Sequence, residues 1–570
     1  MSHRIAAGTA SRGAALTTVA LTTLLLGSAE VAAQHFPNQT PAGPPFFALQ
    51  GARIVTGSGA EIENGTVVIG NGLIEAVGEN VSIPGDARVF DVSGMTVYPG
   101  LFDALSEVGL AGGDDGGPGG GGGGGGGLAA LLAAQQGVTP SDGPEDRPAT
   151  NSWVSAADML DPEAGDIERW RDAGFTTAFL IPGDGIVTGQ GAVVNFGGSA
   201  REMVVKAPAA LRITMSGAGF RSYPGSLMGV ISYVRQLYLD AAHADQYAAR
   251  YEASPRGRNR PVYDRALGPV QDAIRGGWPT LFPADEVREI RRAIRLGNDT
   301  GARVVLTGGH EAYGLADEIA ASGAPVLVSL AWPRRNNNAD PEAEETLASL
   351  ERRAYAPTTP ARLEEAGATW AFYSDDSGGP SAVMENVRKA MEHGLSQDAA
   401  LRALTVSPAR IYGVEAQLGT VEEGKIANLV VADGDIFAEE TTVTMVFVDG
   451  KPFETGEARG ERPEAPPEVD ISGSWVLSLN NDSQEASAEL EVDEDGHVSG
   501  IIVGERGEQQ ITGGWVSGTE FEISARATVG PGRVVEAVYS GVIEDGEMTG
   551  SVQMGQFTMD FTGTRPGGGR

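Results

Sequence analysis

Short runs of alternating apolar and polar residues occur at both flanks of a long central segment. Four strands are predicted before residue 93 and two after residue 427, and Asn-Gly and Asp-Gly pairs mark expected hairpin turns. The strands are Ala48–Thr56, Thr66–Ile69, Leu73–Val77, Val89–Val92, Asn428–Ala432 and Thr442–Val448, and the turns are Asn64-Gly65, Asn71-Gly72 and Asp449-Gly450. We expect the two groups to form one small β-sandwich, from residues 34–97 and 414–453.

The central segment, residues 98–413, alternates strands with helical periodicity. Seven strands are predicted: 96–107, 175–181, 211–215, 279–282, 303–306, 325–330 and 369–374. Strands separated by helices imply parallel pairing with right-handed crossovers. The pattern therefore predicts an α/β fold, a TIM-like (β/α) barrel inserted in the sandwich, with one of its eight strands unaccounted for.

The stretch Thr96–Glu107 is the place where the chain crosses from the sandwich to the barrel. An apolar run enters a Pro-Gly turn and emerges into a strand with a polar tip. Active sites of such barrels lie at the C-terminal ends of the strands. The tip at Leu105–Glu107 is therefore expected in the active-site mouth.

After a Glu-, Gly- and Pro-rich linker at 454–468, only strand patterns remain. They predict a C-terminal all-β accessory domain over 469–566, a sandwich or a small barrel. This domain would either bind an apolar ligand or surface or serve as a structural accessory.

The N-terminus has the features of a secretory signal peptide, residues 1–33. A basic start precedes a short apolar segment, and small residues follow at a cleavage site before Gln34. The mature protein is expected to be periplasmic or secreted, without a membrane span.

Composition narrows the classes of partner. The formal net charge of −35 makes nucleic acid and anionic membranes poor partners, and the lack of cysteine excludes disulfides and thiolate metal sites. The glycine run within 112–127 follows the first barrel strand, where it would be either a mobile lid or a tolerated insertion.

Four segments carry a family resemblance. Tyr98–Ala104, Phe372–Asp375, Leu404–Arg410 and Leu418–Val431 resemble the metal-dependent amidohydrolase superfamily, close to its imidazolonepropionase-like members, over roughly residues 48–452. The resemblance implies a β/α barrel with one or two divalent metals, whose bound water attacks an amide or related C–N bond.

The sequence departs from the family at most metal-binding positions. Where the family has His-x-His at the first strand tip, this chain has Leu105 and Glu107. Pro283 or a neighbour stands where a further histidine would end a strand. Lys206, the only candidate for a bridging lysine, precedes a strand instead of ending one.

The remaining candidates are few. His310 follows a barrel strand and would be a shifted ligand, and Asp375, with Asp376 beside it, matches the family's aspartate at the last strand. A four-histidine binuclear site is excluded because no other histidine follows a barrel strand. One site of Glu107, His310 and Asp375 or Asp376 would suit Zn, Mn or Fe. The alternative is no metal, with these side chains facing water.

Two functions follow. The first is an exported hydrolase acting on carbon–nitrogen bonds other than peptide bonds, with Asp375 as general base and metal ligand. The alternative is a non-catalytic amidohydrolase-fold protein that binds a ligand or partner and has lost the metal site. The expected partners are a small-molecule substrate or ligand and either a second copy of the chain or a catalytically complete paralogue.

Overall fold

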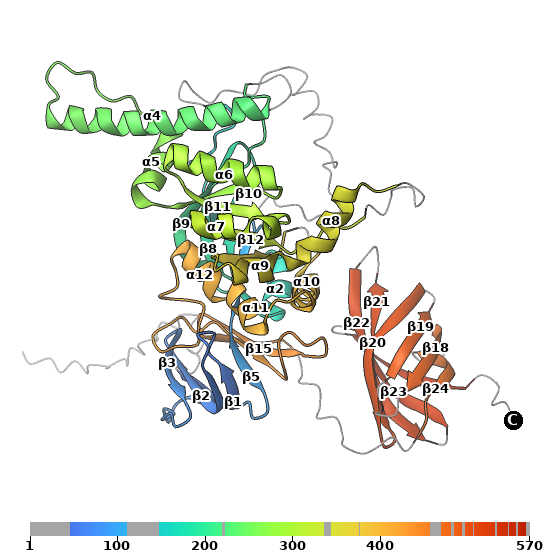
Figure 1. Cartoon of the computed structure of the whole chain (residues 1–570). Coiled ribbons are helices and arrows are strands. Elements are labelled where there is room, and N and C mark those ends of the chain that lie inside the picture. The colour runs from blue at the N-terminus through green and yellow to red at the C-terminus, as the bar shows by residue number, and fades with distance from the viewer. Residues whose placement is uncertain are drawn as a thin grey trace, which may run out of the picture. The chain divides into compact units, whose positions relative to one another are not determined.

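The structure is a computed structural model (Figure 1). It describes residues 46–110, 147–218, 223–335, 344–375, 377–455, 469–479, 484–492, 496, 498–504, 507–529, 533–544, 546–554 and 557–565. The expected signal peptide, the glycine run, most of the 454–468 linker and Asp376 lie outside the described residues.

Both flanks of the chain contribute to one mixed eight-stranded sheet. Its strands are β1 (Phe46–Val55), β2 (Glu61–Gly70), β3 (Leu73–Gly78), β4 (Arg88–Asp91), β5 (Thr96–Pro99), β14 (Leu429–Ala432), β15 (Val443–Val448) and β16 (Lys451–Glu454). The order is β16-β15-β14-β5-β1-β2-β3, with β4 also paired to β1. The flanks therefore join as expected, but in one continuous sheet instead of a sandwich.

Two of the three predicted hairpin turns form. Asn71 and Gly72 have φ of 53° and 82°, and Asp449 and Gly450 have φ of 50° and 72°, as a two-residue hairpin turn with left-handed residues requires. The prediction at Asn64-Gly65 is wrong, because this pair lies within β2. A side chain at Gly65 would meet Ile54 Cδ1 at 2.3 Å, so close strand packing explains this glycine.

The central segment forms a second eight-stranded sheet, ordered β13-β12-β11-β10-β9-β8-β7-β6. Its strands are β6 (Leu101–Ser106), β7 (Phe175–Leu180), β8 (Val187–Asn195), β9 (Val204–Ile213), β10 (Pro279–Ala284), β11 (Arg303–Gly308), β12 (Val326–Ser329) and β13 (Trp370–Tyr373). Neighbouring strands are parallel except at β8, which is antiparallel to both β7 and β9. The missing strand is thus β8, and it corrects the expectation of eight parallel strands.

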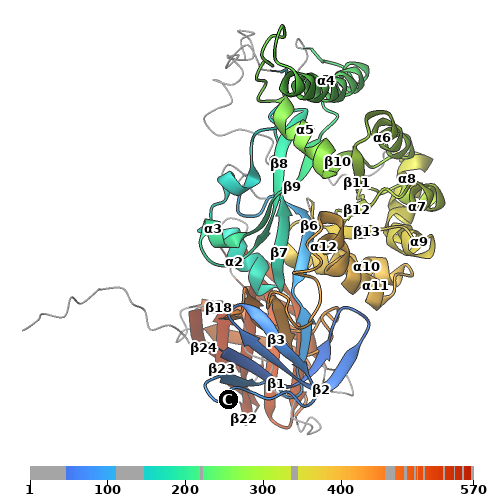
Figure 2. The ribbon, with the colours of Figure 1, turned by 90° about the vertical axis from the view of Figure 1, so that its left-hand side faces the viewer.

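Helices surround this sheet. They are η1 (Ala156–Met159), α2 (Gly165–Asp172), α3 (Ala200–Met203), α4 (Leu227–Ala253), α5 (Leu267–Gly276), α6 (Val287–Thr300), η2 (Ala312–Gly314), α7 (Ala316–Ser322), α8 (Leu347–Tyr355), η3 (Ala356–Thr358), α9 (Thr359–Glu365), α10 (Pro380–Glu392), α11 (Gln397–Ala403) and α12 (Val406–Tyr412). Figure 2 shows α6, α7 and α9 to α11 along the side of β10 to β13.

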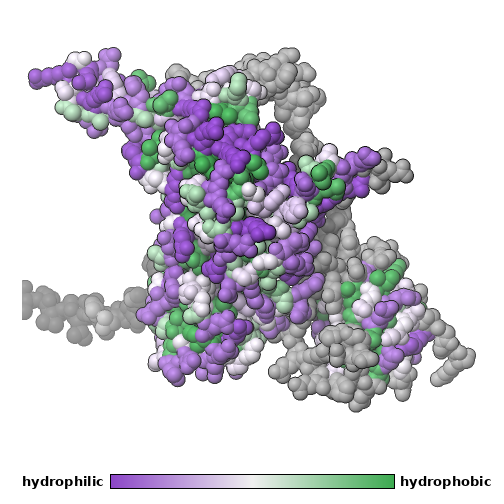
Figure 3. Space-filling model, in the orientation of Figure 1, coloured by the Kyte–Doolittle hydropathy of each residue, from purple (hydrophilic) through white to green (hydrophobic). Residues whose placement is uncertain are grey.

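The helix α6 illustrates why these segments pack as they do. Ile290, Ala293 and Leu296 are spaced three residues apart and are buried against the sheet. The opposite side of the helix carries arginines, and Figure 3 shows a strongly hydrophilic surface over α6. Of the helices in the described ranges, none combines the length and apolar character needed to span a bilayer.

The interior of the central sheet is closed at the N-terminal ends of its strands by α12. The Tyr412 ring stacks on Phe179 with centroids 4.0 Å apart, and its hydroxyl donates to the Ala104 carbonyl at 2.6 Å. At strand starts, Lys206 donates to the Tyr412 carbonyl at 2.6 Å and Arg303 to the Ile411 carbonyl at 3.4 Å. The opposite, C-terminal ends of the strands therefore form the mouth.

The residue Asn428, in the segment that carried the resemblance, links the two sheets. Its amide nitrogen donates to Thr177 Oγ1 at 3.1 Å and to Asn195 Oδ1 at 2.9 Å, and its oxygen accepts from the Asp449 amide at 2.8 Å. The Asn195 amide in turn donates to Asp449 Oδ1 at 2.7 Å. The returning flank strands are thereby fixed to β7 and β8.

The C-terminal residues form a closed eight-stranded antiparallel barrel. Its strands are β17 (Gly473–Leu479), β18 (Gln484–Val492), β19 (Val498–Gly504), β20 (Gly507–Ser517), β21 (Glu520–Val529), β22 (Arg533–Glu544), β23 (Glu547–Met554) and β24 (Phe557–Thr564). Large side chains such as Trp475, Phe521 and Phe561 fill its interior and leave a cavity of about 10 Å³. That volume holds about one water molecule, so the interior of this barrel is a packed core.

Candidate functional site

The residue Asp375 lies at the mouth, directly after β13. Its Oδ2 accepts hydrogen bonds from Ser329 Oγ at 2.8 Å and Tyr373 Oη at 3.2 Å. Its φ is 47°, a left-handed backbone that is uncommon outside glycine. The residue is exposed, which leaves its second oxygen open to the mouth. A strained backbone of this kind often marks a functional position.

Burial and the neighbouring carboxylate both act on Tyr373. Burial raises the pKa of the Tyr373 phenol well above its ordinary value, and the negative charge of Asp375 raises it further. The phenol therefore remains a proton donor to Asp375 across the physiological pH range.

A second group forms where β10 and β11 end. Gly308 and Gly309, with φ of 107° and 71°, turn the chain so that His310 faces Asp285. His310 Nδ1 lies 2.9 Å from Asp285 Oδ1, and the His310 amide donates to the same oxygen at 3.0 Å. An ionised carboxylate only accepts, so in the neutral imidazole Nδ1 carries the proton and Nε2 carries the lone pair.

The free nitrogen of this imidazole is unusual. His310 is only 8% exposed, and its Nε2 is buried without a hydrogen-bond partner in the described part of the chain. Trp332 lies beside the ring, with centroids 5.9 Å apart. A buried, unsatisfied polar atom costs about 1–3 kcal/mol, which is tolerated where it serves a function.

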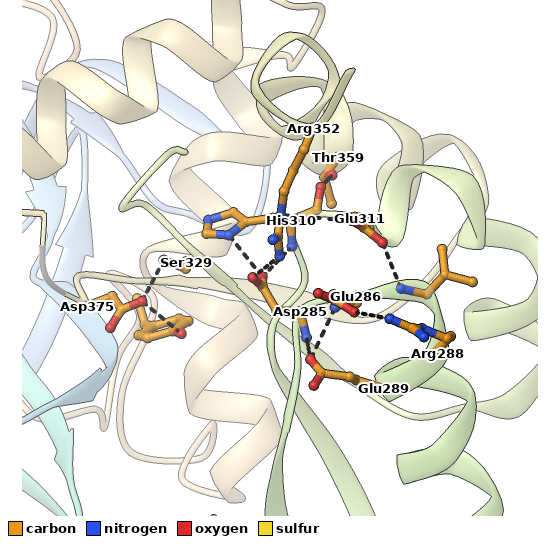
Figure 4. Close-up of polar contacts among 12 residues, drawn as sticks. Asp285, Glu286, Arg288, Glu289, His310, Glu311, Ser329, Arg352, Thr359 and Asp375 are labelled. Carbon is orange, nitrogen blue, oxygen red and sulfur yellow. Dashed lines mark hydrogen bonds and ion pairs between the residues drawn. The ribbon is translucent and has the colours of Figure 1, made fainter. Parts of the chain in front are cut away.

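Arg352, from α8, binds the second oxygen of the Asp285 carboxylate. Arg352 Nη2 donates to Asp285 Oδ2, and its Nε lies 3.9 Å from Glu311 Oε1. Figure 4 shows Asp285 between His310 and Arg352, with Asp375 and Ser329 apart from them. Burial alone would raise the pKa of Asp285, but the hydrogen bonds of His310 and the charge of Arg352 outweigh it and lower that pKa.

The start of α6 fixes the loop that carries Asp285. Glu286 and Glu289 form a capping box, and Glu289 Oε2 accepts from the Asp285 amide at 3.1 Å. Glu311 Oε2 accepts from the Val287 amide at 3.0 Å. The Asp285–His310 pair is therefore built on rigid elements on both sides.

A third carboxylate, Asp103, is buried between β6 and β13. It accepts from the Ser374 amide at 3.0 Å and from Ser374 Oγ at 2.6 Å. Burial raises the pKa of Asp103 to about 6, although these hydrogen bonds act in the opposite direction. Because Ser374 precedes Asp375, Asp103 bridges the first and last strands beneath the mouth.

The other sequence candidates lie apart from these groups. Leu105 is buried in the interior apolar cluster and cannot ligate. Glu107 is exposed, and its Oε1 lies over Gly183, 3.5 Å from where a Cβ would stand. Pro283 is part of β10, and Lys206 lies at the opposite end of the strands.

These placements test whether the residues fit the metal that the resemblance implies. Within the described residues, no three His, Asp or Glu side chains converge as a ligand group. His310 is bonded to Asp285, whereas Asp375 is bonded to Ser329 and Tyr373. The described side chains therefore do not form a three-ligand metal site.

Comparison with known proteins matches part of the chain to a family model. Residues 290–453 match the family model described as "Amidohydrolase family". The chain contains an amidohydrolase family domain. The match runs from α6 to β16 and includes His310, Arg352 and Asp375, while Asp103 and Asp285 precede it.

The chain is also similar to solved structures. An amidohydrolase from Thermotoga maritima MSB8 is 26% identical, with a TM-score of 0.59, covering 72% of this chain and 100% of that one. A Xaa-Pro dipeptidase with bound methionine is 16% identical (TM-score 0.41; 72% and 100% covered). A zinc-bound adenosine deaminase from Xanthomonas campestris is 15% identical (TM-score 0.39; 71% and 92% covered).

Sequence reasoning missed three residues of this candidate site. Asp285 could have been found, because it stands three residues after a predicted strand, within the first turn of the helical pattern expected at 284–298. Asp103 lies inside the recognised motif but has no sequence signal of burial. Arg352 comes from α8, far along the chain, and no local pattern relates it to Asp285.

Proposed function

We propose that this protein is a hydrolase of carbon–nitrogen bonds other than peptide bonds, belonging to the imidazolonepropionase-like branch. The family domain supports a hydrolase, and the motifs at the sheet junctions support the branch. The observation that carries the proposal is the buried His310 imidazole, oriented by Asp285 and left with a free Nε2 at the strand ends.

Because His310 Nε2 is buried, the proposal requires a side-chain movement that admits water to it. The Nε2 lone pair would then take a proton from that water while the water oxygen bonds to the amide carbonyl carbon. The C–N bond then breaks, and the imidazolium returns the proton to the departing nitrogen. Asp285 stabilises the imidazolium, and Arg352 keeps that carboxylate in place and ionised. Water and amide are thereby converted to a carboxylic acid and an amine.

Asp375 would act on the same substrate from the other side of the mouth. Its second oxygen has no partner in the described part of the chain, so it can accept a hydrogen bond from the substrate N–H or from the water. Ser329 and Tyr373 hold the first oxygen and fix its direction. In this role Asp375 orients the reactants, while His310 alone takes the proton.

We further propose that the protein holds at most one divalent ion. Glu107, His310, Asp375 and Asp376 are the residues to which such an ion would be assigned, and the described ones among them do not converge. Elemental analysis after dialysis measures this directly. Two tightly held ions per chain would contradict the proposal, and Asp375→Asn should remove whatever single ion is present.

Export and partners remain parts of the proposal. The N-terminal sequence supports a periplasmic or secreted protein, with a second copy of the chain or a complete paralogue as partner. Fractionation of cells that make the full chain, followed by mass measurement of the recovered protein, tests both points. Recovery of uncleaved protein from the cytoplasm would contradict export.

The decisive experiment is turnover of N-acyl amino acids and cyclic amides by wild type, His310→Asn and Asp285→Asn. We expect His310→Asn to lower kcat by about 10²–10⁴-fold, because a general base is lost. His393→Asn is the matched control, since His393 is exposed at the end of α10. Equal rates for His310→Asn and wild type would exclude His310 as the base.

One observation favours the second function, a binding protein without catalysis. Leu105 fills the first strand tip with apolar surface, and the described carboxylates and imidazoles form no ligand group of three. In that case the amides would bind to wild type without turnover, and His310→Asn would change affinity alone.

A further inference from the structure

The C-terminal end of α4 extends past the packed part of the central segment. The last buried residue of this helix is Ala241, yet the helix continues to Ala253, which adds twelve residues or ~18 Å. Figure 1 shows this end of α4, and the loop that follows it, projecting beyond α5 and α6. Residues 250–263, here named the tip, are therefore left uncovered by the other described elements of the central segment.

Positive charge is concentrated at the tip of this acidic protein. Between residues 250 and 260 the chain has four exposed arginines and one glutamate, whereas the whole sequence has a formal net charge of −35. Within the described part of the chain none of the four forms an ion pair. Several exposed arginines elsewhere do pair, such as Arg53 with Glu61 and Arg402 with Glu364, both at 2.6 Å. The unpaired arginines, available to an anionic partner from solution, are Arg250, Arg256, Arg258 and Arg260.

Two large apolar side chains are exposed at the end of the same loop. Val262 is 92% exposed and Tyr263 is 77% exposed. Apolar surface in water is unfavourable, and an apolar environment would relieve that cost. The tip therefore combines two features, unpaired positive charge and exposed apolar surface, that a single partner would have to match.

The loop that carries these residues is fixed to α4 at two places. Arg147 binds both Asp240 of α4 at 2.8 Å and Asp264 at 3.0 Å, directly after the apolar pair. In the middle of the loop, the Asn259 carbonyl accepts from Tyr247 Oη of α4 at 2.8 Å. The folded chain thus holds the apolar pair and the arginines next to one another on one projecting surface.

We propose that the tip binds the surface of an anionic lipid bilayer. The arginines are attracted to anionic headgroups, while Val262 and Tyr263 enter the boundary between headgroups and acyl chains. Tyrosine suits that boundary, because its ring is apolar and its hydroxyl stays hydrated. A polyanion in solution, such as a nucleic acid, would meet the arginines but leave Val262 in water. This inference does not depend on the proposed hydrolase function.

The net negative charge of the protein does not prevent this contact. Charges separated by more than about 10 Å are largely screened at 0.1 M salt, and the unburied part of α4 alone is ~18 Å long. The tip therefore meets a bilayer mainly through its own charges. Binding should occur at about 0.1 M salt and weaken at about 1 M, where the arginines themselves are screened.

The test is sedimentation of the full chain with vesicles, either of phosphatidylcholine alone or of an equimolar mixture with phosphatidylglycerol. Wild type should bind the mixed vesicles at least about 10-fold more tightly than the neutral ones. Arg256→Gln/Arg258→Gln/Arg260→Gln should weaken binding to the mixed vesicles by about 10- to 100-fold. Val262→Ser/Tyr263→Ser should weaken it by about 10-fold.

Two control variants match these changes elsewhere on the surface. Arg169→Gln/Arg201→Gln/Arg410→Gln removes three exposed arginines from α2, α3 and α12. Leu347→Ser removes a side chain of α8 that is 70% exposed. Both controls should bind like wild type.

The expected losses in the tip variants, with circular dichroism spectra like that of wild type, support the proposal. It is overturned if wild type does not sediment with the mixed vesicles, or if it binds neutral vesicles equally well. It is also overturned if both folded tip variants bind like wild type, or if the arginine control loses as much binding as the arginine tip variant. Retention of wild type by immobilised DNA without any vesicle binding would assign the tip to a polyanion instead.

Discussion

At the scale of single residues, Asp103 is a buried carboxylate whose protonation links pH to the stability of the fold. Its carboxylate has a pKa of about 6 in the folded chain against 3.8 ordinarily, so the folded state retains a proton that the unfolded chain has released. Asp103 therefore contributes most to the free energy of unfolding below about pH 4, and this contribution falls as the pH rises to 6. The shift corresponds to roughly 3 kcal/mol.

We compare the unfolding free energies of wild type and Asp103→Asn at pH 4 and pH 7. Between these pH values wild type should lose about 3 kcal/mol of stability relative to the variant. Denaturant unfolding at several pH values measures it. Subtracting the unfolding free energy of the variant from that of wild type at each pH removes the contribution of the other carboxylates, which both proteins share. A difference that is constant with pH would show that Asp103 keeps its ordinary pKa.

At this scale the sequence predicted candidate site residues but not their hydrogen-bond partners. His310 was found because it follows a predicted strand, and Asp375 because it matches the family's aspartate at the last strand. That His310 is bonded to Asp285, and Asp375 to Ser329, depends on which strands are neighbours. Such neighbours are set by tertiary packing, which a local pattern does not encode.

At the scale of elements, Gly100 separates β5 from β6 and so the flank sheet from the central one. A Cβ at this position would stand 2.1 Å from Thr176 Oγ1 and 2.8 Å from Thr176 Cβ. We expect Gly100→Ala to destabilise the chain by about 1–3 kcal/mol through overpacking. Thermal unfolding measures this.

Gly85→Ala is the matched control, because nothing lies within 4 Å of a Cβ there and its φ is not left-handed. It should leave stability unchanged or raise it by up to about 1 kcal/mol. Equal melting temperatures for the Gly100 and Gly85 variants would mean that the crossing tolerates a side chain.

The elements that the sequence predicted best were those with a helix between strands. A predicted strand overlaps each of the seven parallel strands of the central sheet, because a polar, periodic segment or a turn separates each from the next. Two of them were misplaced: the strand predicted at 211–215 covers only the end of β9, and the one predicted at 96–107 is divided between β5 and β6. β8 was missed because it follows β7 through a short turn and contains Gly189 and Gly191. Antiparallel pairing then needs no crossover helix, so the alternation that guided the prediction is interrupted there.

At the scale of the whole molecule, the C-terminal barrel has its own core of Trp475, Leu477, Phe521, Tyr539 and Phe561. Its first and last strands pair, so the barrel has no free edge. We expect residues 469–566 to fold when expressed alone. A poorly dispersed amide NMR spectrum of that fragment would contradict this expectation.

The split flank sheet has a consequence for the order of synthesis. β5 pairs with β14, whose first residue, Leu429, leaves the ribosome about 330 residues after Pro99. At typical elongation rates of about 5–20 residues per second, that interval is roughly 15–70 seconds. Throughout it, the edge of β5 with Val97 and Tyr98 has no partner strand. The nascent chain must therefore keep this apolar edge from pairing with another chain until the central sheet has emerged.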